Sequence, residues 1–400
     1  MNRLRSLDGL RGVAATVVVC HHVLLVVPAV AATVIASPGD IGTVVWWLDR
    51  TPLRILWAGQ EAVLLFFVLS GYVLTHLISR RQAIPRGIRS YYGQRLVRLY
   101  VPVWGATALA VALALLVPRA TTGLDSWIAG HESVSPGAVL MDLTLVVNTS
   151  SLNTPLWSLQ WEVLFSLALP VAWWVVRGLP IRRHWMLWSA FLVACSAAGR
   201  IGVAGGLTGG LVVDMALTYV PVFGVGMVLA HAQAEVTRTA RRLDREGRRR
   251  WAWPVVVVLS LLGLVSTSYA PMGASWVVHA VTAGAALAAA AALLVAVLQW
   301  PRLSAALETP TAQWLGTRSF SIYLVHEPIV VAAAIAVRAD SWGWLALAPA
   351  VVVLAGGVAA IFYRLVERPA IQLSHRVGHR LEAGGPRVRA RTAEQETAVG

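Results

Sequence analysis

The chain has 400 residues, of which 57% are hydrophobic and only 13% are charged, and its formal net charge is +14. Soluble domains carry about twice that share of charged residues, so the composition excludes a soluble globular fold. The positive charge comes from arginine alone, since the chain has no lysine.

Apolar runs long enough to cross a bilayer recur along nearly the whole chain, because about 20 residues span about 30 Å of hydrocarbon. The sequence predicts an all-α integral membrane protein with about ten transmembrane helices. The first run is long and carries Arg11, His21 and His22, so we expect a retained helix rather than a signal peptide. The ten runs lie near residues 9 to 33, 57 to 78, 99 to 118, 156 to 176, 185 to 203, 211 to 231, 252 to 269, 276 to 298, 319 to 337 and 344 to 363.

The arginines gather in alternate loops and at the chain's end, where acidic residues are few. Such a distribution is the positive-inside pattern, and it predicts that both termini lie in the cytoplasm, in agreement with an even number of spans. It also explains the charge without a nucleic-acid partner; membrane lipids are the expected surroundings. The clusters run from Arg80 to Arg98, Arg177 to Arg183, Arg238 to Arg250 and Arg364 to Arg391.

No linker or change of composition divides the chain, so residues 1 to 369 are expected to form one transmembrane domain. Residues 370 to 400 would form a cytoplasmic tail. A short surface helix from Arg368 to Leu381 opens it, and disorder follows from about Gly384, where apolar periodicity ends.

The longest external loop runs from Arg119 to Pro155 and contains an apolar stretch, Ala138 to Val147, that is too short to span the membrane. This stretch predicts a helix at the outer face. It either covers a cavity or lies in the interface as an ordinary surface helix.

Ionisable residues at membrane depth are costly, so each is a functional candidate. In the first span, Arg11 and His22 are eleven residues apart, which places them on one helix face about 16 Å apart along the axis. Asp8 lies near the same face and is expected to pair with Arg11. His22 has the chemistry of a general base for a hydroxyl, although a histidine that only bonds a neighbouring helix fits the pattern equally well.

Polar residues also follow helical spacing in later spans. Arg95 and Arg98 would present two guanidinium groups to one point, as phosphate binding requires, or anchor lipid headgroups. Glu61 lies near the outer end of the second span, where it fits the interface. Cavity-lining positions are expected deeper in the bundle, namely Ser70, Ser158, Ser319, Tyr323 and His326, together with Glu162 one to two turns into the fourth span.

Six motifs in chain order resemble the acyltransferase-3 family of bacterial membrane O-acyltransferases. Together they cover almost the whole chain. The resemblance implies ten core transmembrane helices in the bacterial cytoplasmic membrane and transfer of an acyl group, often acetyl, from coenzyme A to a hydroxyl of a carbohydrate or glycosylated natural product. The motifs are Arg5 to His22, Phe66 to Tyr72, Arg95 to Pro102, Pro155 to Glu162, Ser319 to Pro328 and Tyr363 to Pro369.

Carried over by position, His22 resembles the family's essential histidine and Arg11 its paired arginine. Arg95 and Arg98 match its Arg-x-x-Arg element, and Glu162 matches the acidic residue of its Trp-Ser-Leu motif. The surroundings of Glu162 depart from the family pattern. We expect no appended esterase-like domain after the last span, so transfer would be completed within the membrane domain or by a separate partner protein.

The expected catalytic set is His22, Arg11, Asp8 and Glu162, with acyl-CoA held by Arg95, Arg98 and Arg11. Acyl-CoA is the donor substrate, and no permanently bound cofactor is expected. The ten histidines show no spacing typical of a metal site. The rival interpretation is a transporter or exporter of a lipid-linked saccharide or metabolite, in which the same buried charges form a substrate path.

Overall fold

The computed structural model describes residues 4–35, 42–81, 87–119, 126–131, 134–146, 148–204, 211–245, 249–270, 274–339 and 341–383. Within these ranges every regular element is helical, as the composition predicts, and no strand occurs. The tail that follows residue 383, for which disorder is expected, lies outside the described residues.

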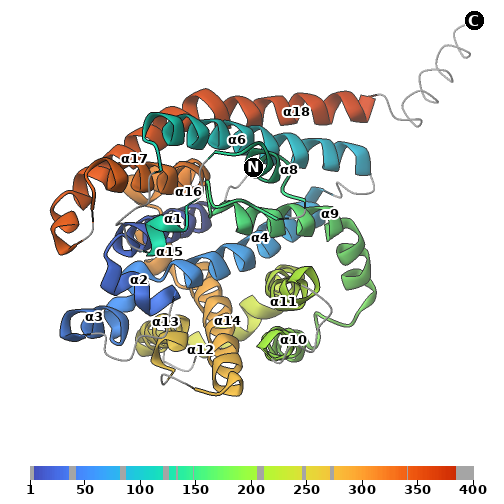
Figure 1. The fold of residues 1–400 in the computed structure, drawn as a ribbon. Coiled ribbons are helices and arrows are strands. Elements are labelled where there is room, and N and C mark those ends of the chain that lie inside the picture. Colours follow the sequence, from blue (N-terminus) through green and yellow to red (C-terminus); the bar gives the residue numbers. More distant parts are fainter. Residues whose placement is uncertain are drawn as a thin grey trace, which may run out of the picture.

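The helices of the N-terminal half comprise five long apolar helices and several short elements between them (Figure 1). They are α1 (Arg5–Leu25), α2 (Pro28–Ile35), α3 (Gly42–Asp49), η1 (Pro52–Trp57), α4 (Gly59–Arg81), α6 (Ile88–Leu116), α7 (Ser126–Ala129), α8 (Pro136–Thr144), α9 (Leu156–Gly178) and α10 (Trp185–Ala204).

The C-terminal half continues the bundle and ends in a long composite helix. Its elements are α11 (Leu211–His231), α12 (Gln233–Arg245), α13 (Arg249–Leu264), η2 (Ser266–Tyr269), α14 (Trp276–Gln299), α15 (Pro301–Leu307), α16 (Pro310–Ala336), η3 (Trp342–Ala346), α17 (Ala348–Phe362), the π-helical turn η4 (Tyr363–Glu367) and α18 (Arg368–Ala383).

Each of the ten predicted runs is occupied by a helix. Among the described residues, seven helices are long and apolar enough to cross a membrane, or eight if α11 and α12, bent by 73° at their junction, form one span. Two further apolar helices, Trp185–Ile201 and Trp251–Leu264, are shorter. The chain is therefore a multi-pass membrane protein, while ten spans and cytoplasmic termini stay predictions.

Helices α1, α4 and α16 occupy the middle of the bundle (Figure 1). Glycines set how closely they approach. A Cβ atom on Gly316 would lie 2.2 Å from the carbonyl oxygen of Asp8, and one on Gly12 would lie 2.5 Å from the amide nitrogen of Gly316. Backbone therefore packs against backbone where α1 crosses α16, as small residues permit inside a membrane.

A second close crossing joins α4 to α11. A Cβ on Gly71 would lie 2.1 Å from the carbonyl oxygen of Phe223, and one on Gly226 would lie 2.1 Å from that of Val68. Small residues in these two helices thus allow close helix approach. Only glycine fits at these two positions without moving backbone.

The predicted surface helix near the C-terminus forms, and it runs alongside α6 (Figure 1). Ser90 Oγ donates to the carbonyl oxygen of Gly378 at 3.0 Å, and Gly93 faces Leu381 and Val377. Helix α6 begins at Ile88, eleven residues before the predicted run, because this polar first part is covered by α18. The π-helical turn joins α17 to α18 without a break.

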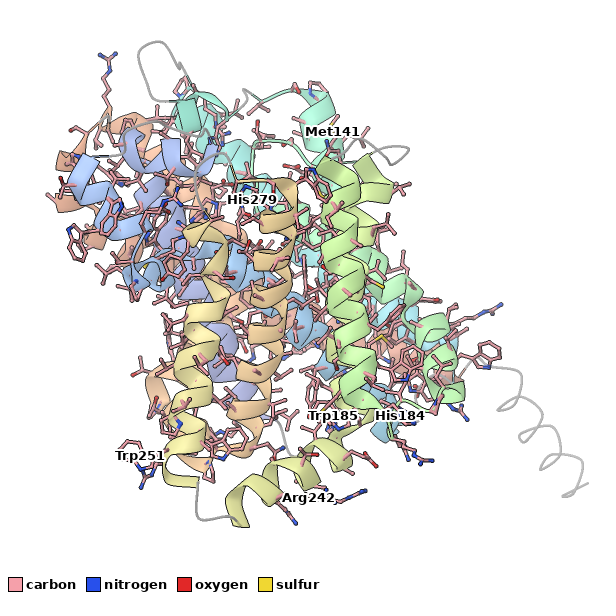
Figure 2. The ribbon with its side chains drawn as sticks, turned by 90° about the horizontal axis from the view of Figure 1, so that it is seen from below. Met141, His184, Trp185, Arg242, Trp251 and His279 are labelled. Atoms are coloured by element: carbon pink, nitrogen blue, oxygen red, sulfur yellow. The ribbon has the colours of Figure 1, made fainter. Side chains whose placement is uncertain are left out.

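Helices α10, α11, α13 and α14 form the other side of the molecule, and α12 crosses beneath them. Figure 2 shows Arg242, Trp185 and Trp251 at one end of these helices, and His279 and Met141 toward the other. Met141 belongs to α8, the helix predicted in the long external loop, which packs against α6. Tyr100 Oη donates to the carbonyl oxygen of Thr144 at 2.7 Å, so this loop is fixed to the bundle.

The close α1–α16 contact predicts that adding one methyl group at this crossing destabilises the protein, whereas adding one at an open position does not. Gly316→Ala should lower the free energy of unfolding by about 1–3 kcal/mol, because its Cβ overlaps backbone atoms of α1. Gly356→Ala, on α17 with nothing within 4 Å of its Cβ, should be neutral or raise stability by up to about 1 kcal/mol. Thermal unfolding in detergent measures both. Equal effects of the two substitutions would contradict this packing.

Candidate functional site

A cavity of about 120 Å³, here called the arginine pocket, lies between α1, α4, α6, α9 and α16. Its walls combine charged, hydroxyl and apolar side chains; the apolar ones come mainly from α4, among them Phe66 and Leu74. Eight residues singled out from the sequence line it, which are Arg11, Ser70, Arg95, Arg98, Ser158, Glu162, Ser319 and Tyr323.

Arg95 is held in this pocket by side chains of α9. Its Nη2 atom donates to Ser166 Oγ at 2.7 Å and lies 3.3 Å from Glu162 Oε1. Glu162 thus pairs with Arg95, and the structure does not bring it to His22. Arg98, one turn further along α6, exposes its guanidinium in the same cavity.

Glu367 is a pocket residue that the sequence analysis did not single out. It closes the π-helical turn, and its Oε2 atom accepts hydrogen bonds from the backbone N–H of Ser321 at 3.1 Å and from the Ser321 hydroxyl at 2.5 Å. Short π-helical segments often occur at functional sites. This turn brings a carboxylate from the last helix to the wall of the cavity.

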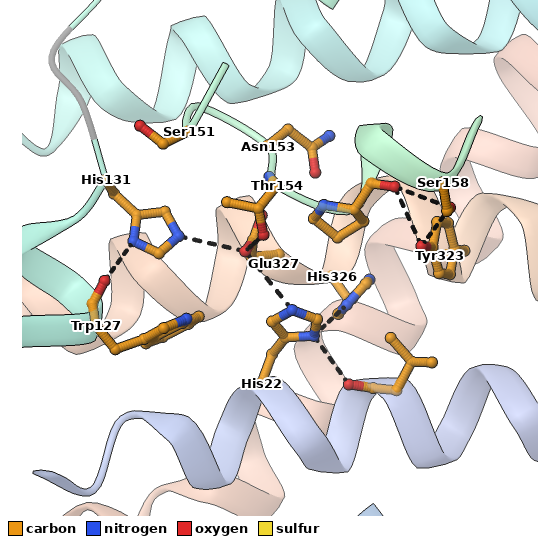
Figure 3. A network of polar contacts seen from close by, with 12 residues as sticks. His22, Trp127, His131, Ser151, Asn153, Thr154, Ser158, Tyr323, His326 and Glu327 are labelled. Atoms are coloured by element: carbon orange, nitrogen blue, oxygen red, sulfur yellow. Dashed lines mark hydrogen bonds and ion pairs between the residues drawn. The ribbon is translucent and has the colours of Figure 1, made fainter. Parts of the chain in front are cut away.

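A second group of polar side chains lies at the opposite end of α1, and we call it the histidine–glutamate centre. Figure 3 shows His22 facing His326 and Glu327 of α16, with His131 on the other side of Glu327. His22 Nε2 lies 3.7 Å from Glu327 Oε1, and His131 Nε2 lies 3.3 Å from the same oxygen. His22 retains 13% side-chain exposure, whereas Glu327 has none.

Hydrogen bonds to backbone carbonyls define the histidine tautomers, because a carbonyl oxygen only accepts. His326 Nδ1 donates to Ile322 O at 3.0 Å, so its Nε2 accepts, at 3.1 Å, from His22 Nδ1. The same Nδ1–H of His22 also points at Val18 O, 3.0 Å away. The lone pair of neutral His22 is therefore on Nε2, the atom nearest Glu327 and the one available to take a proton.

Glu327 accepts hydrogen bonds from the segment between α6 and α9. The backbone N–H of Thr154 donates to Oε2 at 2.5 Å, and the Thr154 hydroxyl donates to Oε1. His131 Nδ1 donates to Trp127 O at 3.0 Å, and its Nε2 atom lies 3.3 Å from Glu327 Oε1, so a proton between these two atoms joins the ring to the carboxyl group. Burial of an isolated carboxylate is costly, and these bonds compensate that cost.

A proline explains how Thr154 reaches this position. Pro328 lies inside α16 and has no N–H, so the carbonyl oxygen of Leu324 lacks its helical partner. Asn153 Nδ2 donates to that oxygen at 2.9 Å and docks the loop segment against α16. Arg119 further fixes this segment by donating to the carbonyl oxygens of Ser151 and Leu152 at 3.3 and 3.1 Å.

Tyr323 connects the arginine pocket to the histidine–glutamate centre. It lines the pocket, its hydroxyl lies 2.7 Å from Ser158 Oγ and donates to Pro155 O at 3.1 Å, and its ring centroid lies 5.9 Å from that of His326. His326 itself is fully buried and bonds His22 instead of lining the pocket. The two groups of residues are thus separated by a single side chain.

Of the residues expected to form one site, the structure brings Arg11, Arg95, Arg98 and Glu162 together in the arginine pocket and places His22 outside it. Arg11 and His22 lie toward opposite ends of α1, with His22 one turn from the end of the helix. Asp8 lies on the first turn of α1, outside the pocket lining. No three of the described His, Cys, Asp and Glu side chains are grouped as ligands for a metal ion.

Sequence reasoning missed Glu327, His131, Thr154 and Glu367. Glu327 lies inside a predicted span. Because an ionisable residue at membrane depth is costly, that position alone would have marked Glu327 as a functional candidate. Nothing in the local sequence marks His131, because only the folded loop brings it to Glu327.

Comparison with known proteins identifies the family of the chain. Residues 4–364 match the family model described as "Acyltransferase domain", and the chain belongs to this acyltransferase-3 family. The protein is thus an acyltransferase by family.

A relative in the same class is "Acyltransferase MdmB" from Streptomyces mycarofaciens, which is 27% identical over 399 residues, covering 93% of this chain and 92% of the relative. No solved structure matches the chain.

The bonds to Glu327 predict a stability difference between two threonines. Thr154→Val removes a hydroxyl donor from a fully buried carboxylate and should lower the free energy of unfolding by about 1–3 kcal/mol. Thr144→Val, whose exposed hydroxyl bonds a carbonyl of its own helix, should change it by less than about 0.5 kcal/mol. Denaturant titration in detergent compares them. If the losses are similar, Thr154 does not stabilise Glu327.

Proposed function

We propose that the protein is an O-acyltransferase that moves an acyl group, in the first instance acetyl, from acyl-CoA to a hydroxyl of a carbohydrate or glycosylated natural product. It acts in the bacterial cytoplasmic membrane, with about ten spans and both termini in the cytoplasm. His22 serves as the general base. Family membership supports the transferase class, and the geometry supports the division of roles.

The observation that carries this proposal is the short route from the arginine pocket to the base. Tyr323 forms the pocket wall, and His326 behind it bonds His22. A cationic cavity separated by one side chain from the histidine pair that contains the proposed base suits an anionic donor with a long arm and a reactive thioester at its tip. Acyl-CoA has those properties.

Donor binding falls to the arginines of the pocket. Arg98 and Arg11 would contact phosphate groups of coenzyme A, and Arg95 would do so from the position that Glu162 and Ser166 give it. Glu162 is then a positioning residue for Arg95. The apolar side chains of α4 would line the path of the pantetheine arm.

The chemistry balances without an acyl-enzyme. His22 Nε2 takes the proton of the acceptor hydroxyl while its oxygen attacks the thioester carbonyl carbon. The imidazolium formed faces Glu327, whose charge stabilises it. When the tetrahedral intermediate collapses, the C–S bond breaks and the thiolate takes the proton from His22. The products are the ester and free coenzyme A, and the ring returns to its starting tautomer.

Replacement of the base should abolish transfer and leave the donor site intact. His22→Ala should lower kcat by about 10²–10⁴, the usual value of general-base catalysis, with little change in acyl-CoA affinity. His375→Ala, exposed on α18, is the matched control and should keep wild-type activity. Release of free CoA thiol measures the reaction. Full activity in a folded, donor-binding His22→Ala protein would rule out this role.

Loss of a pocket arginine should weaken donor binding specifically. Arg98→Ala removes a charge-assisted phosphate contact worth about 1.5–3 kcal/mol, so KM for acetyl-CoA should rise by about ten- to a hundredfold. The exposed Arg364→Ala variant should keep the wild-type KM. Initial rates at varied acetyl-CoA concentration measure both. An unchanged KM in Arg98→Ala would place the donor elsewhere.

A further inference from the structure

A separate cavity of about 580 Å³ lies between α4, α9, α10, α11, η2 and α14. Helix α4 contributes Gln60 to Leu64 to it, whereas the arginine pocket takes residues from Phe66 onward. His279, which lines this cavity, lies in Figure 2 at the opposite end of the bundle from Arg242. The cavity therefore faces the end of the bundle where the external loop lies.

Glu61 gives this cavity an unfilled hydrogen-bonding position. The residue is 8% exposed, and its Oε1 atom accepts from the hydroxyl of Thr267 at 2.9 Å. Its Oε2 atom is buried without a hydrogen-bond partner among the described residues. A buried carboxylate oxygen without a donor costs several kcal/mol, so such a group in a cavity wall calls for a ligand that donates to it.

The other walls restrict the chemistry of that ligand. Arg200 supplies hydrogen-bond donors, and the rings of Trp157 and Tyr219, 5.5 Å apart, form an aromatic surface together with Trp276. Hydroxyl groups can donate to a carboxylate and accept from a guanidinium, whereas an ammonium group can only donate. Aromatic faces pack against the apolar face of a saturated ring.

We propose that this cavity binds a glycosyl ring, with Glu61 Oε2 accepting a hydrogen bond from one of its hydroxyls. The site lies close to the proposed base, because Gly59, next to Gln60 of the cavity wall, packs against the ring of His21, whose centroid lies 5.2 Å from that of His22. The ring is accordingly the glycosyl part of the acceptor. That last assignment rests on the proposed function, whereas binding of the ring does not.

Titration with phenyl β-D-glucoside by isothermal calorimetry tests the site, in a detergent without sugar headgroups. The wild type should bind it saturably, and benzyl alcohol should not compete. Glu61→Gln, which keeps the shape but removes the charge, should weaken binding about tenfold or more. Glu308→Gln, an exposed acid outside the cavity, is the matched control and should bind as the wild type does.

The thermal midpoint of Glu61→Gln shows whether this variant folds. If it does not fold, a second variant tests the same site. Ala280→Phe fills the cavity and leaves Glu61 in place, and it should also abolish binding. Absence of saturable binding to the wild type, or unchanged binding in the folded variants, would overturn the site. Glucoside binding in a protein that never releases CoA thiol would refute acyl transfer instead and leave the site standing.

Discussion

The structure depends on accommodating one buried carboxyl group, Glu327, inside a bundle of apolar helices. A carboxyl group with 0% exposure needs polar partners in place of water, and these come from α1, from the segment before α9 and from the loop after α7. The same interaction therefore orients His22 and ties His131 and Thr154 to the core. The connection between α6 and α9, held in this way, becomes a fixed wall of the site rather than a surface loop.

A single helix pair supplies both ends of the proposed reaction path. Glycines let α1 and α16 touch at backbone distance near Gly12 and Gly316, and this contact fixes the register in which His22 meets His326 two to three turns further along. Arg11 and Tyr323, on the same two helices, line the arginine pocket. One close helix contact thus positions both the pocket residues Arg11 and Tyr323 and the proposed base His22.

Sequence reasoning located the helices because hydrocarbon thickness fixes their length, and it grouped the pocket residues because helical spacing fixes their faces. It missed the extended start of α6, whose polar face is covered by a distant segment, α18. The sequence also did not predict which residues, distant along the chain, contact each other in the fold. Glu162 bonds Arg95, and His131 bonds Glu327 over 196 residues, through contacts that no local pattern encodes.

The central claim is that coenzyme A enters through the arginine pocket and presents its acyl group to His22. A structure of the protein with a non-hydrolysable acetyl-CoA analogue tests it most directly. We expect phosphate groups beside Arg95 and Arg98, and an acyl carbonyl carbon close enough for a hydroxyl bonded to His22 Nε2 to reach, about 3–3.5 Å from that oxygen. An analogue bound outside this pocket, or with its acyl end remote from His22, would contradict the account.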